Sequence, residues 1–71
     1  MRRFTASDGV VWEAVLGHES WGTFVVLFTP ARGGSVRKAV LAAETALAAE
    51  TELDALSDDS LRTLLADSSP W

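Results

Sequence analysis

Apolar and polar positions at the start of the chain follow the pattern of a β-hairpin. Two short apolar runs, 4–6 and 10–16, flank the turn sequence Ser7-Asp8-Gly9. A two-residue Asp-Gly turn would place Phe4 and Trp12 on opposite faces of the hairpin. A three-residue loop, with its glycine in the left-handed conformation, pairs Phe4 with Trp12 and gathers the apolar side chains on one face. The pattern therefore predicts the three-residue loop.

The next apolar segment lacks this alternation and predicts a central strand from about 22 to 29. A polar turn at 17–20 precedes it, and every residue from 24 to 28 is apolar. A strand that is apolar on both faces is usually covered on both sides. The sequence 30–34, which contains two glycines, ends it. The following segment, 35–41, predicts either a fourth strand or the start of a helix, and both remain open.

Alanine and leucine recur at helical spacing in the second part of the chain, which predicts two helices. Ser57, followed by two aspartates, is a suitable N-cap for the second helix, because its hydroxyl can accept an amide and the acids suit the helix dipole. Residues 67–71 show no periodicity and predict an irregular tail. The stripe of the first helix comprises Ala42, Ala46, Ala49, Leu53 and Leu56, and that of the second comprises Leu61, Leu64 and Leu65.

Together these elements predict an α+β fold, with a three- or four-stranded antiparallel β-meander followed by two C-terminal helices packed on one face. We expect a single small domain over 1–71, in which 1–41 form the β-sheet half, 42–66 the helical half and 67–71 the irregular tail. The pattern does not decide which face of the sheet the helices cover. The predicted core comprises Phe4, Trp12, Leu16, Phe24, Val26, Phe28, Leu53, Leu56, Leu61 and Leu65.

Length and composition exclude several classes of protein. The chain has 71 residues, 48% of them hydrophobic, which excludes a multidomain enzyme and a doubly wound nucleotide-binding fold. It has no cysteine and a single histidine, so we expect no disulfide, no metal site within the chain and no cofactor. The basic start at 1–3 is not followed by the apolar region of a signal peptide, and no apolar run is long enough to span a bilayer. We therefore expect a cytoplasmic protein.

Charge is distributed unevenly along the chain, whose net charge is −4. Residues 1–38 carry five basic and three acidic side chains, whereas 39–71 carry one basic and seven acidic. Basic residues beside aromatic ones on a sheet are typical of several RNA-binding modules, although such domains are usually basic overall. Nucleic-acid binding is therefore the alternative function. Its candidate contacts are Arg2, Arg3, Arg32, Arg37 and Lys38.

Two segments superficially resemble catalytic or phosphate-binding motifs. His18, Glu19 and Ser20 are adjacent, but their spacing does not match a nucleophile elbow, and a serine nucleophile also needs a positioned base and an oxyanion site. The segment 32–35 lacks the length and the lysine of a Walker loop. Both segments predict ordinary connections between strands, so we expect no catalytic residue and no enzyme.

The second face of the sheet points to association with another chain. If the helices cover the face that carries Phe4, the other face presents Val11, Val15 and either the Val25 and Leu27 pair or the 24, 26 and 28 set. Two short helices cannot cover both faces, and an exposed apolar face usually marks a partner contact. The alternative is that arginine stems, such as those of Arg3 and Arg37, lie across it.

Trp71 follows Ser-Ser-Pro and has two interpretations. It either packs on its own sheet or anchors another chain, because tryptophan is enriched at interface hot spots. We expect a non-catalytic protein-interaction or regulatory module, acting as a homodimer or as an accessory subunit. The candidate interaction residues are Val11, Val15, Trp21, Val25, Leu27 and Trp71.

Overall fold

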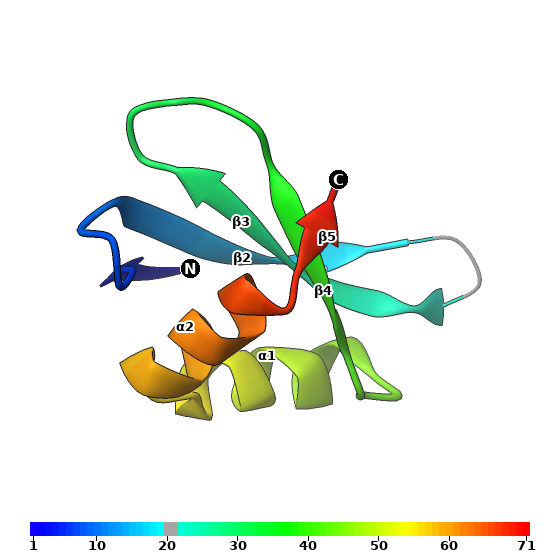
Figure 1. Cartoon of the computed structure of the whole chain (residues 1–71). Helices are drawn as coiled ribbons and strands as arrows, with labels where there is room; N and C mark the ends of the chain where they lie inside the picture. Colours follow the sequence, from blue (N-terminus) through cyan, green and yellow to red (C-terminus); the bar gives the residue numbers. More distant parts are fainter. Residues whose placement is uncertain (20–21) are drawn as a thin grey trace.

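The computed structural model describes residues 1–19 and 22–71 as a five-stranded antiparallel sheet with two helices (Figure 1). Each strand pairs with its neighbours in sequence, in the order β1-β2-β3-β4-β5, and the helices connect β4 to β5. This α+β arrangement confirms the predicted fold class. The elements are β1 Arg2–Thr5, β2 Val11–His18, β3 Phe24–Pro30, β4 Arg37–Leu41, α1 Ala46–Ala55, α2 Asp58–Ala66 and β5 Ser69–Pro70.

The predicted strand count is wrong, because the segment expected to be an irregular tail forms a fifth strand. Lys38 in β4 pairs with Ser69, and the Trp71 amide donates to the Val36 carbonyl at 3.0 Å. Two residues are too few to show an alternating pattern, and their partner strand lies about 30 residues earlier in the chain. The open question at 35–41 is settled in favour of a strand.

The first hairpin has the predicted register and turn. Phe4 pairs with Trp12, and Gly9 has a φ of 86°, a conformation that glycine adopts without strain. The Gly9 amide donates to the Ala6 carbonyl at 2.9 Å, and the Asp8 carboxylate accepts the amide of the residue after Gly9 at 3.0 Å. The three-residue loop is therefore confirmed.

Side-chain caps fix where both helices begin. The Thr45 hydroxyl accepts the Ala48 amide at 3.1 Å, and the Ser57 hydroxyl accepts the Ser60 amide at 3.1 Å. The Ser57 cap was predicted. The first helix was expected to start at Ala42, but it starts four residues later, because the chain needs a connection after β4 and Thr45 supplies the cap.

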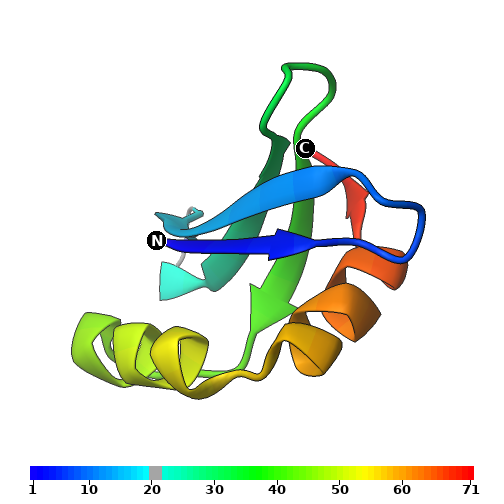
Figure 2. The same cartoon turned by 90° about the vertical axis from the view of Figure 1, so that its left-hand side faces the viewer.

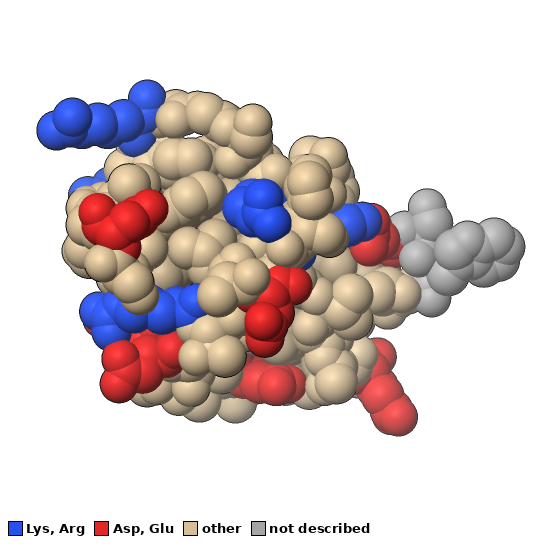
Figure 3. Space-filling view, in the orientation of Figure 1, with Lys and Arg blue, Asp and Glu red and all other residues tan. Residues whose placement is uncertain are grey.

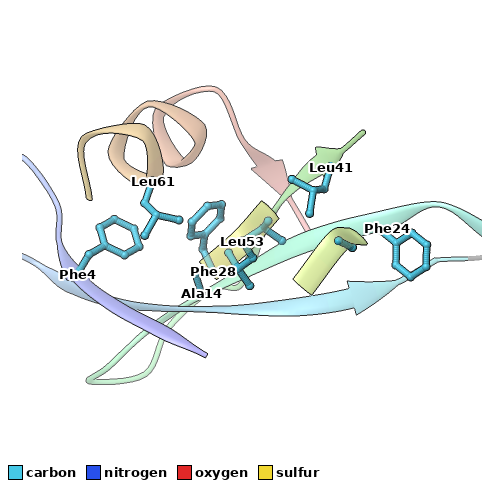
Figure 4. Packing of buried hydrophobic residues seen from close by; sticks show 9 residues of the cluster. Phe4, Ala14, Phe24, Phe28, Leu41, Leu53 and Leu61 are labelled. Atoms are coloured by element: carbon cyan, nitrogen blue, oxygen red, sulfur yellow. The ribbon is translucent and has the colours of Figure 1, made fainter. Parts of the chain in front are cut away.

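Both helices lie on the same side of the sheet and cover the face that carries Phe4 (Figure 2). Phe28 is fully buried, and its ring meets the ring of Phe4 edge-on, with the centroids 5.9 Å apart. Leu61 of α2 packs beside these two rings (Figure 4). The predicted core is confirmed, with Trp12, Leu16, Leu56 and Leu65 only partly buried at its margin, and the structure adds Ala14, Leu41 and Ala49.

No helix in the described ranges has the length and apolar character needed to cross a membrane.

Candidate interaction surface on the open face of the sheet

The face of the sheet that points away from the helices is the candidate site, and we call it the open face. Side chains alternate along a strand, so the residues next to Phe4, Trp12 and Phe28 in sequence point to this side. The register places Val25 opposite Val40 and Val15 opposite Leu27 on it. The open face comprises Arg3, Thr5, Val11, Glu13, Val15, Gly17, Val25, Leu27, Thr29, Lys38, Val40 and Trp71, with Glu19 beside them.

The centre of the open face is closed by its own side chains. Val25 is 0% exposed, although it was predicted to contact a partner. Its cross-strand neighbour is Gly17, and the Leu27 side chain occupies the space above that glycine. A Cβ atom on Gly17 would lie 2.8 Å from Leu27 Cδ1. Val25 is thus buried within this face, and the accessible apolar surface lies at the positions around it.

The exposed apolar side chains lie toward the margins of the open face. Trp71 is 62% exposed, Val40 67% and Val11 37%, whereas Val15 and Leu27 are half-buried. The backbone of Trp71 is held by its hydrogen bond to β4, and Lys38 Nζ lies 5.5 Å from the centroid of its ring. Trp71 therefore packs on its own sheet and still presents most of its surface to solvent.

Trp21, the remaining candidate interaction residue, lies outside the described residues.

Two ion pairs balance the charge of the open face. Lys38 Nζ lies 2.7 Å from a Glu19 carboxylate oxygen, and Arg3 Nη2 lies 2.8 Å from a Glu13 carboxylate oxygen. Ion pairs at this level of exposure contribute little to stability. Their main effect is on the net charge of the open face. Its two positive and two negative groups cancel, so its net charge is zero.

Arg2, a candidate nucleic-acid contact, lies on the helix side and joins the two helices. Its Nη1 atom donates to the carbonyl oxygens of Leu53, Asp54 and Leu56, at 3.1, 3.2 and 2.6 Å. Its Nη2 atom lies 3.0 Å from a carboxylate oxygen of Asp58, in the first turn of α2. The guanidinium group therefore satisfies carbonyls at the end of α1, where a positive charge is favourable. The sequence gives no signal for this role.

The other basic candidates are divided between the two faces of the sheet, and Arg3 and Arg32 line one hollow. Arg37 also lies on the helix side, where Nε donates to the Ser68 hydroxyl at 2.8 Å and Nη2 to the Ser68 carbonyl at 2.6 Å. The idea that the Arg37 stem covers the open face is therefore wrong, whereas Arg3 does lie there. Arg32 is exposed in the connection between β3 and β4. Figure 3 shows the basic side chains at separate points on this side of the molecule, without a continuous basic patch.

In the two segments that resemble catalytic or phosphate-binding motifs, the residues that the structure describes make structural contacts. His18 ends β2, and its ring stacks on Phe24 with the centroids 4.7 Å apart. Glu19 is the partner of Lys38, and Ser20 lies outside the described residues. The Gly33 amide donates to the Pro30 carbonyl at 2.9 Å, as in a tight turn. Across 1–19 and 22–71, no three acidic or histidine side chains are placed to hold a metal ion.

Comparisons of the chain with protein-family models, with curated proteins and with solved structures found no match.

Proposed function

We propose that this protein is a non-catalytic interaction module that associates with a second copy of itself through the open face. The observation that carries the proposal is the combination of exposed apolar side chains, Trp71 and Val11, with a surface of zero net charge. Exposed apolar groups on a sheet face favour association, and a tryptophan with most of its ring accessible is a typical anchor.

The distribution of charge supports a second copy as the partner. The helical half is strongly acidic, so two molecules that approach through their helices repel each other. The open face carries equal numbers of both signs and imposes no such repulsion. In a two-fold arrangement the same patch serves both partners, and the arginine and lysine of one copy can face the glutamates of the other.

The size of the molecule sets how much of this face must be used. A stable dimer buries about 800 Å² on each partner. The whole chain exposes 4501 Å², so the interface would take about a fifth of its surface. Trp71 and Val11 cannot provide that area alone. The contact must therefore span the sheet from β1 to β5 and include both ion pairs.

Analytical ultracentrifugation of the full chain and two variants tests the proposal. We expect the 7.6 kDa chain to sediment as a dimer at micromolar concentration, and Trp71→Ser and Val11→Glu to sediment as monomers with unchanged circular dichroism. Leu47→Glu is the matched control, because Leu47 is 76% exposed on α1 and lies away from the open face. It should leave the dimer intact.

Two results would contradict self-association through this face. One is a monomeric wild-type protein at all concentrations up to the millimolar range. The other is equal loss of the dimer in Leu47→Glu and Trp71→Ser, since that would place the interface elsewhere. Val25→Glu is not a suitable variant, because the side chain is buried and its replacement would unfold the domain.

The placement of the basic residues favours a protein over a nucleic acid as the partner. Arg2 and Arg37 are engaged on the helix side, and Arg3 and Lys38 are paired with glutamates. Nucleic-acid binding depends on several free cations acting together on one surface. This function is therefore the weaker candidate.

A further inference from the structure

A shallow groove runs along the helix layer, and we call it the helix groove. Two hollows of about 510 and 670 Å³ form it, and they adjoin because they share Ala42 and Glu52. The smaller hollow is lined by Leu41, Leu56 and Leu64, and the larger one chiefly by alanines. The acidic residues Glu44, Glu52 and Asp59 line the rim. Figure 1 shows where β4 leads into the connection with α1, which forms one side of this groove.

The rim of the helix groove is acidic. Asp59 is paired with Arg62 at 2.6 Å, and the Arg62 guanidinium is also held by the Thr5 carbonyl of β1 at 2.7 Å. Glu44 and Glu52 have no ion-pair partner among the described residues, and no basic side chain there lines the groove. In Figure 3 the acidic side chains gather on the lower side of the molecule, where Figure 1 shows the helices.

We propose that the helix groove binds a basic amphipathic segment of a different protein. Apolar side chains of that segment would lie on Leu41, Leu56 and Leu64, and its lysines or arginines would face Glu44 and Glu52. An apolar floor with a charged rim is the surface that a docked amphipathic helix requires, and complementary charge sets which helices bind.

A second copy of this chain is not a suitable occupant. Its helices are acidic, with five acidic residues and one arginine between 46 and 66, so they would be repelled by the same rim. Arg2 and Arg37 of a second copy are held on its helix side, and its Arg3 and Lys38 lie on the open face that self-association would cover. The groove therefore needs a partner of the opposite charge, distinct from the second copy that binds the open face.

Fluorescence anisotropy with a labelled synthetic peptide tests this site in the full chain. The probe has about 18 residues, with leucine at the positions of one helix face and lysine elsewhere. We expect micromolar binding of this peptide. A peptide with glutamate in place of lysine, and one with serine in place of leucine, should each bind at least about tenfold more weakly.

Variants of two glutamates on the same helix locate the contact. Glu52→Lys should weaken binding of the lysine peptide about fivefold, because it reverses a charge on the rim. Glu50→Lys is the matched control, because Glu50 lies beside Met1 and Leu16 on another side of α1. It makes the same change in net charge and should alter affinity less than about twofold.

Three results would overturn the proposal. They are no binding of the lysine peptide at low salt, equal weakening by Glu50→Lys and Glu52→Lys, and undiminished binding of the serine peptide. The last two would show attraction to the acidic half as a whole, without use of the groove. Trp71→Ser separates this proposal from self-association, because it should abolish the dimer and retain peptide binding.

Discussion

The two faces of this sheet are closed in different ways. On the helix side, Phe4, Phe24 and Phe28 are buried beneath two helices. On the open face none of the described elements covers the strands, and Leu27 folds over Gly17 to bury Val25. A domain of this size has enough chain to cover one face only. Because Gly17 has no side chain, Leu27 can fold over it and close this part of the open face without a further layer.

The faces also use arginine differently. Arg2 and Arg37 are held on the helix side by backbone carbonyls, and they join elements that are more than 30 residues apart in sequence. Arg3 on the open face forms an ion pair with its cross-strand neighbour Glu13. Arg2 and Arg37 therefore link distant parts of the chain, whereas Arg3 is a charged side chain at the surface.

The largest difference should appear when one buried side chain is truncated on each face. Phe28→Ala should lower the free energy of unfolding by about 3–5 kcal/mol, because it leaves a large cavity under the helices. Val25→Ala should lower it by about 2 kcal/mol, because the side chain is smaller and its neighbours can relax toward solvent. Urea denaturation followed by circular dichroism measures both. Equal losses would mean that the open face is packed as a second core.

The next test compares the two arginines of β1. Arg2→Met should lower the free energy of unfolding by about 2 kcal/mol, because it leaves carbonyls at the end of α1 without their charged donor. Arg3→Met, the matched control in the same strand, should change it by less than about 0.5 kcal/mol. Thermal denaturation of the two variants separates these outcomes. If Arg3→Met lowered the free energy of unfolding as much as Arg2→Met, Arg2 would not differ from Arg3 as a structural link.

The smallest expected effect concerns the closure of the open face itself. Gly17→Ala should destabilise the protein by about 1 kcal/mol, because the added Cβ meets the Leu27 side chain at 2.8 Å. The same change in a Leu27→Ala background should be close to neutral. A double-mutant cycle measures the coupling between the two sites. If Gly17→Ala had the same effect in both backgrounds, Leu27 would not be the group that closes this face.

Local chemistry explains which parts of the fold the sequence predicts. The register of the first hairpin follows from Gly9 and from the alternation around it, and the second helix start follows from Ser57. These features depend on neighbours within a few residues. The core leucines and phenylalanines were also predicted, because a face that is buried must be apolar.

The features that the sequence does not predict depend on pairs of distant residues. The burial of Val25 requires Gly17 to lie opposite it in β2. The prediction that 17–20 form a turn is therefore wrong for Gly17 and His18, because their pairing with β3 extends the strand. The links made by Arg2 join it to carbonyls more than 50 residues away. Every residue has a backbone carbonyl, so the sequence does not distinguish an arginine that binds carbonyls from an arginine that is exposed at the surface.

The short fifth strand has a consequence for how the chain is made. The meander from β1 to β4 consists of neighbours in sequence and can form as soon as residue 41 is available. Until residues 69 and 70 are added, the outer side of β4 is an unpaired edge that another nascent chain could join. Once β5 is in place, Pro70 gives the new edge a residue without an amide donor. Protection of this edge is therefore limited to the part of β4 at Arg37 and Lys38, and it lasts only while β5 stays paired.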